Sequence, residues 1–188
     1  MPIRSGLFSA LPRDTPRAAV AVFGKGNIYL TIGDQFGPLL TDIDFARLDP
    51  VREQPASTLA VLALVTAFQF VEGLPDRRAV EAVRTRLDWK YALHLPLAYP
   101  GLEDLVLCRF RQLALNEPPA HAVFQQICDR LAQTSLLRDA DAQWPGGHEV
   151  LAAVCRISLL EQLVEAMHAV LESLAVVEPG WLLANTLP

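Results

Sequence analysis

The fold of this chain is decided by its central stretch from Thr66 to Arg111, which reads TAFQFVEGLPDRRAVEAVRTRLDWKYALHLPLAYPGLEDLVLCRFR. The stretch opens with the end of an apolar helix and breaks at Gly73 and Pro75. Gly73 can adopt a positive φ and close the first helix, and Pro75 suits the first turn of the next one. The pattern predicts two helices joined by a short turn, followed by a third helix over 103–114.

The second helix of this unit is expected from Asp76 to Leu87, with Val80 and Val83 on its inward face. Arginines on the outer side of a short second helix can reach phosphates or a groove, so the unit is a candidate helix-turn-helix. The candidate DNA-contacting residues are the seven basic side chains of the central stretch: Arg77, Arg78, Arg84, Arg86, Lys90, Arg109 and Arg111. A solvated charged face is the competing interpretation, because acidic residues interrupt the cluster.

Two aromatic residues, Trp89 and Tyr91, follow the second helix and lie close to several leucines. This apolar setting predicts core or hinge residues rather than groups that stack on bases.

The rest of the chain up to residue 133 is expected to be mainly helical, which makes the fold class mainly α. A helix over 59–71 is apolar around its whole circumference, which indicates a buried central helix. The other expected elements are a helix over 18–23, a short strand or extended arm over 28–32, a helix over 41–48 and an amphipathic helix over 120–133.

The last segment shows the clearest periodic pattern, which predicts one long amphipathic helix. Its apolar residues alternate at steps of three and four: Val150, Ala153, Ile157, Leu160, Val164, Met167, Leu171 and Leu174. A helix of this length cannot bury its stripe by itself, so it must pack on the rest of this chain or on another copy. Folding back on the rest of the chain is the default expectation.

The length and composition favour one globular domain with an extension. The chain has 188 residues, 52% of them hydrophobic, and a formal net charge of −5. We expect a helical, DNA-binding-like domain over 1–135, a linker over 136–147, and a long helix and tail over 148–188. The acidic balance argues against indiscriminate nucleic-acid binding but leaves room for a local basic patch.

Other classes of site have little support in the sequence. The three cysteines, Cys108, Cys128 and Cys155, are widely spaced and form no CxxC pair or Cys/His cluster, so we expect reduced thiols and no metal or other cofactor. The longest apolar run is far shorter than the ~20 residues of a membrane span, and no signal peptide is visible. The expectation is a cytoplasmic protein with no membrane partner.

Several separated words of this sequence resemble one protein family. They are FVEGLPDRRAVEAVRTRLDWKYALHLPL at Phe70–Leu97, LVLCRFRQLAL at Leu105–Leu115, FGKGNIYL at Phe23–Leu30, and the segment from Val150 to Leu182. The chain resembles the N-terminal (InsH-like) domain of IS5/IS1182-type bacterial insertion-sequence transposases. The resemblance implies binding to the terminal inverted repeats of such an element.

The same resemblance indicates where the catalytic carboxylates of such a transposase would lie. Related transposases use three carboxylates that bind two Mg²⁺ ions, and the first lies in an Asp-Ser-Thr-His word. Here Gly146 and Gly147 precede His148, and glycine stands in the place of that aspartate. The chain also ends at Pro188, before the second and third carboxylates of the family, so we predict no catalytic residue and no enzyme activity.

The resulting hypothesis is a truncated, non-catalytic, transposase-derived DNA-binding protein. Its expected partners are DNA at insertion-sequence ends and, through Val150–Leu174, a second copy or a full-length transposase. The alternative is a protein-interaction or dimerisation module, or a decayed fragment, that makes no contact with DNA.

Overall fold

The computed structural model describes residues 13–24, 26–35, 40, 56–133 and 144–186. These residues form nine α-helices and no β-strand, so the predicted mainly α fold is confirmed. The helix expected over 41–48 lies outside the described residues. The helices of the described part are α1 (Asp14–Phe23), α2 (Ile28–Asp34), α4 (Ala56–Glu72), α5 (Asp76–Thr85), α6 (Leu87–Ala92), α7 (Asp104–Asn116), α8 (Pro118–Ala132), α9 (Gly147–Val177) and α10 (Pro179–Thr186).

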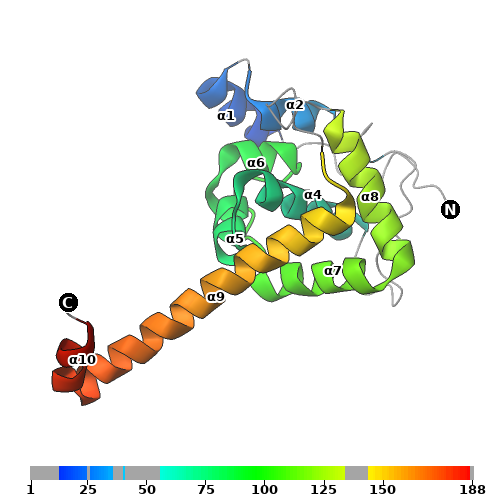
Figure 1. The fold of residues 1–188 in the computed structure, drawn as a ribbon. Helices are drawn as coiled ribbons and strands as arrows, with labels where there is room; N and C mark the ends of the chain where they lie inside the picture. The colour runs from blue at the N-terminus through cyan, green and yellow to red at the C-terminus, as the bar shows by residue number, and fades with distance from the viewer. Residues whose placement is uncertain (1–12, 25, 36–39, 41–55, 134–143, 187–188) are drawn as a thin grey trace.

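We call the part of the structure through Ser158 the body. Helix α4 lies at the centre of the body and is covered by α5, α7, α8 and the start of α9 (Figure 1). Its side chains are buried on every side, and Ala60, Leu64 and Phe68 have no exposed surface. An element that is apolar around its circumference is stable only inside a core. The predicted central helix is therefore confirmed.

Helix α2 occupies the segment for which a short strand was predicted, so that prediction was wrong. The side chain of Asn27 accepts hydrogen bonds from the backbone N–H groups of Tyr29, at 2.8 Å, and Leu30, at 3.4 Å, and starts the helix. Tyr29 and Ile32 are buried against the body. The cap and this packing outweigh the β propensity of the local sequence.

Helix α5 is shorter than expected, because it ends at Thr85 and Arg86 is extended, with φ −82° and ψ 123°. The chain turns there and begins α6, which carries Trp89 into the core. The Trp89 ring lies 5.3 Å from that of Phe68 and has no exposed surface, and Tyr91 is also buried. The prediction that both aromatics are core residues is confirmed.

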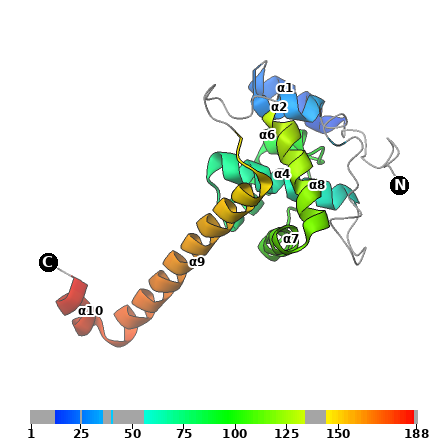
Figure 2. The same cartoon turned by 45° about the vertical axis from the view of Figure 1, so that its right-hand side comes forward.

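Helix α9 is one continuous helix of 31 residues, as the heptad pattern predicts. Its first turns, through Ser158, pack on α4, α7 and α8. Beyond Ser158 the helix leaves the body, and α10 packs on its far end (Figures 1 and 2). Leu160 is 62% exposed and Met167 is 63% exposed. The expectation that the whole helix folds back on the chain was therefore wrong.

No single helix among the described residues is both long and apolar enough to cross a membrane. Helices α4 and α5 reach the required length and composition only as a pair, across a bend of 111°. The domain boundary expected at 136–147 stays a prediction, since most of that segment lies outside the described residues.

Candidate nucleic-acid interface

The turn between α4 and α5 sets the direction of the arginine-bearing helix. Gly73 has a φ of +65°, and the backbone N–H of Leu74 donates to the carbonyl of Gln69 at 2.9 Å, which closes α4. Pro75 then caps α5 in an extended conformation. Three residues thus change the helix direction by 111°.

Arg111 lies inside the body rather than on its surface. Its side chain is 2% exposed and donates two hydrogen bonds to the carboxylate of Asp76, at 2.6 and 2.5 Å. The amide of Gln69 donates to the same carboxylate at 2.9 Å. Burial opposes the charge of Arg111, but the bonds to Asp76 outweigh it and raise the arginine pKa. This network ties α4, α5 and α7 together.

Arg86 belongs to a second, half-buried network. Its guanidinium pairs with Glu72 and with Asp88, at 2.7 Å for the latter. It also lies over the rings of Tyr29 and Trp89, at 5.3 and 5.1 Å from their centroids. Burial disfavours its charge, but the two carboxylates raise its pKa overall. Burial and a hydrogen bond to Glu72 also raise the pKa of Tyr29.

Two other predicted contact residues are also set apart from α5. Lys90 is buried and donates a hydrogen bond to the backbone carbonyl of Leu97. Arg109 is exposed on α7. It lies two residues from Arg111, and two residues rotate a helix by about 200°. Arg109 therefore points away from Asp76 and α5, and the structure does not bring it next to the other exposed arginines.

The remaining predicted residues form what we call the arginine surface of α5: Arg77, Arg78 and Arg84. All three side chains are exposed. Arg78 pairs with Glu81 at 3.3 Å on the same helix, and Arg84 makes no ion pair with any described residue.

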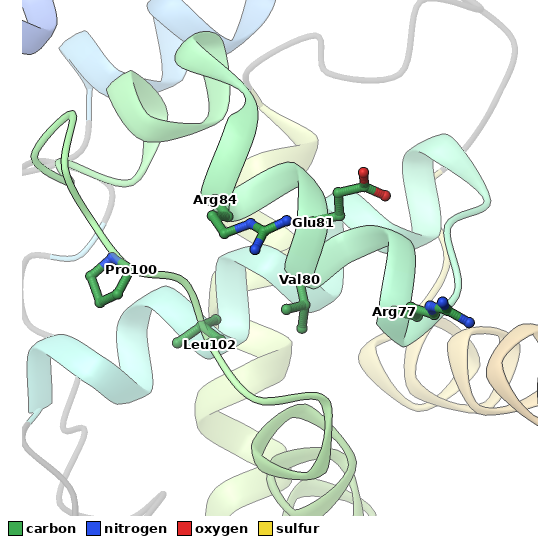
Figure 3. Close-up of a pocket in the computed structure, with 6 residues that line it drawn as sticks. All are labelled: Arg77, Val80, Glu81, Arg84, Pro100 and Leu102. Atoms are coloured by element: carbon green, nitrogen blue, oxygen red, sulfur yellow. The ribbon is translucent and has the colours of Figure 1, made fainter.

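An open groove of about 370 Å³ runs along this surface (Figure 3). Arg77, Val80, Glu81 and Arg84 line it from α5, and the segment with Pro100 and Leu102 lines the opposite side. The groove therefore combines charged and apolar walls beside the arginine surface.

Two contacts from α9 reach this region, and nothing in the sequence indicates them. The backbone N–H of Asp76 donates to the hydroxyl of Ser158 at 3.3 Å. The guanidinium of Arg77 pairs with the carboxylate of Glu165. In the sequence Glu165 belongs only to the polar face of a heptad repeat, and its partner lies 88 residues away.

Gly147, at the start of α9, is tightly packed against α8. A Cβ atom added to Gly147 would lie 3.0 Å from Gln125 Oε1 and 3.2 Å from the Phe124 ring. The backbone N–H of Gly147 donates to the same amide oxygen. Within the described residues, no group of three or more His, Cys, Asp or Glu side chains could hold a metal ion, and the three cysteines are free.

Comparison with known proteins gives one family. Residues 32–113 match the family described as Transposase domain (DUF772). This range covers the α4–turn–α5 unit, α6 and most of α7, and it supports a relation to transposases. Neither the curated proteins nor the solved structures gave a match to this chain.

Proposed function

We propose that this chain is a non-catalytic, transposase-derived DNA-binding protein in which α4 and α5 form a helix-turn-helix unit. The observation that carries the proposal is the 111° angle between α4 and α5 across a three-residue turn. Helix-turn-helix units join two helices at roughly 90–120° through a short turn that often contains glycine, as Gly73 does here. The match of residues 32–113 to a transposase domain supports the transposase-derived part of the proposal.

In this proposal α5 is the helix that faces DNA. Arg77, Arg78 and Arg84 lie on its exposed side and would contact phosphates, which fix the register of a protein on the duplex. The resemblance to insertion-sequence transposases makes the terminal inverted repeats the proposed target. Arg86, Lys90 and Arg111 would act indirectly, because their side chains hold the body together.

A salt titration of DNA binding tests the proposal. Wild type, Arg84→Ala and Arg109→Ala would be titrated against a repeat-end duplex and a scrambled duplex. Each phosphate contact that is lost should reduce the slope of log K against log salt by about 0.9. We expect this loss for Arg84→Ala and an unchanged slope for Arg109→Ala, which removes the same charge from another face. No binding by wild type to either duplex at low salt would rule the proposal out.

A second candidate function is self-association, and the exposed part of α9 favours it. The apolar residues of this part continue the heptad stripe that begins at Val150, and Leu160, Val164 and Met167 are all more than half exposed. A stripe of this period packs best on another helix of the same period, which a second copy supplies. Leu160→Asp should then shift sedimentation from dimer to monomer. A wild-type protein that sediments as a monomer at high concentration would exclude this function.

The absence of catalysis is also part of the proposal. It is supported by the close packing at Gly147, where an added Cβ would lie 3.0 Å from Gln125 Oε1 and 3.2 Å from the Phe124 ring. We expect no nicking of a repeat-end duplex with Mg²⁺ or Mn²⁺. Nicking activity that copurifies with the chain through successive columns would contradict this part of the proposal.

A further inference from the structure

Helix α9 runs beside the amino-terminal end of α5. Ser158 contacts the backbone of Asp76, and Glu165 pairs with Arg77. These two α9 residues are seven positions apart, which corresponds to about 10 Å along a helix. Figure 3 shows the Arg77 side chain next to α9, at the end of the groove away from Pro100. An acidic part of α9 therefore faces the arginine surface.

A second carboxylate, that of Glu161, lies in the same place. It is one helical turn before Glu165 and is half-buried. Burial and the neighbouring charge of Glu165 raise its pKa, and the charges of Arg77 and Arg78 oppose this shift. Glu161 therefore lies on the same side of α9 as Glu165, which pairs with Arg77.

We propose that Glu165, together with Glu161 one helical turn before it, competes with DNA phosphates for Arg77, so that α9 weakens DNA binding by the arginine surface. The inference rests on the proposed function. Carboxylate and phosphate oxygens accept hydrogen bonds from the same guanidinium fork, so one can replace the other. In helix-turn-helix proteins the first residues of the second helix contact DNA, and this is the end of α5 that α9 occupies.

The competition leaves the arginine surface with two unlike ends. Arg77 is paired with Glu165, whereas Arg84, two turns further along α5, has no ion pair with any described residue. DNA would therefore contact Arg84 first and then displace the carboxylate of Glu165 from Arg77. The side chains of Arg77 and Glu165 are 70% and 51% exposed, so the pair is weak enough to be exchanged.

The test is DNA binding by full-length charge variants, with a mixed-sequence duplex as the probe because phosphate contacts do not depend on sequence. Glu165→Gln and Glu161→Gln remove a carboxylate charge and keep the side-chain size. Glu172→Gln, two turns further from α5 on the same helix, is the matched control for net charge. We expect Glu165→Gln to tighten binding about two- to fivefold at low salt, and Glu172→Gln to tighten it less. In an Arg77→Ala background the gain from Glu165→Gln should disappear.

The possible failures separate the two proposals. If wild type binds, Arg84→Ala weakens binding, and Glu165→Gln behaves like Glu172→Gln, the competition is excluded and the proposed function stands. A gain from Glu165→Gln that persists in the Arg77→Ala background would also exclude competition for Arg77. If neither wild type nor the Glu161→Gln/Glu165→Gln double variant binds the duplex at low salt, the proposed function itself fails.

Discussion

The apolar repeat of α9 runs through two parts of the helix that lie in different environments. In the first part Val150 is fully buried and Ala153 and Ile157 are half-buried, whereas Leu160, Val164 and Met167 in the second part are more than half exposed. The first part belongs to the body, and we call the rest of α9 with α10 the arm. The comparison shows that a heptad pattern specifies a helix with an apolar stripe, but not what covers the stripe.

The largest expected effect comes from placing a charge in the buried part of α9. Leu151→Asp would bury an unpaired carboxylate. We expect the unfolding free energy to fall by more than about 4 kcal/mol, or the protein not to fold. Leu160→Asp, the same change in the arm, should leave the unfolding free energy of the monomer within about 0.5 kcal/mol of the wild-type value. Denaturant titration at low protein concentration measures both. Similar losses in the two variants would show that the arm is covered within one chain.

Two tryptophans provide the next comparison. Trp89 in the body is fully buried, and Trp89→Ala should cost about 3–5 kcal/mol of unfolding free energy. Trp181 in the arm is 54% exposed, so Trp181→Ala should cost much less. Thermal unfolding followed by circular dichroism distinguishes them. A small effect of Trp89→Ala on stability, with loss of DNA binding, would instead indicate that Trp89 stacks on bases.

Two arginine–carboxylate pairs form a third comparison, with a largest effect of similar size. Arg111→Ala would leave Asp76 charged and buried, at a cost of about 3–5 kcal/mol. Arg77 pairs with Glu165 of the arm in solvent, and Arg77→Ala should cost less than about 1 kcal/mol. Chemical unfolding of both variants at neutral pH gives the two values. Equal costs would mean that the contact between body and arm is far stronger than its exposure indicates.

The smallest expected effect is a loss of stability at alkaline pH, and it comes from Tyr91 in the body. A hydrogen bond to Asp34, at 2.6 Å, is the main reason that the pKa of Tyr91 rises from 10.0 to about 12. Between these two values the unfolded chain loses the proton first, so stability is complete below about pH 10 and falls as the pH rises. Tyr91→Phe lacks this group and should lose less stability across the same window. An identical pH dependence in both proteins would contradict the effect of Asp34.

Much of the fold followed from local patterns in the sequence. The apolar circumference of α4, the Gly73–Pro75 break and the heptad of α9 each predicted the element that is present. The start of α2 was missed, because the cap by Asn27 outweighs a β-branched run. The break at Arg86 was missed for a different reason, since no glycine or proline marks it and the burial of Trp89 requires it.

The candidate site was also predicted only in part. The sequence identified seven basic residues but could not separate the buried from the exposed ones. Arginines that pair inside the body and arginines that face solvent do not differ in their spacing along the sequence. Asp76 and Asp88, which in the sequence only dilute the positive charge, are the internal partners of Arg111 and Arg86.

The sequence by itself determined the helices, their main breaks and the positions of the basic residues, since these depend on periodicity, capping and turn residues within a few positions. Only the tertiary structure decided which arginines remain exposed, where α9 leaves the body, and that Glu165 meets Arg77 across 88 positions. The physical reason is that burial and ion pairing depend on elements distant in the chain, whose relative placement follows from the packing of the whole core.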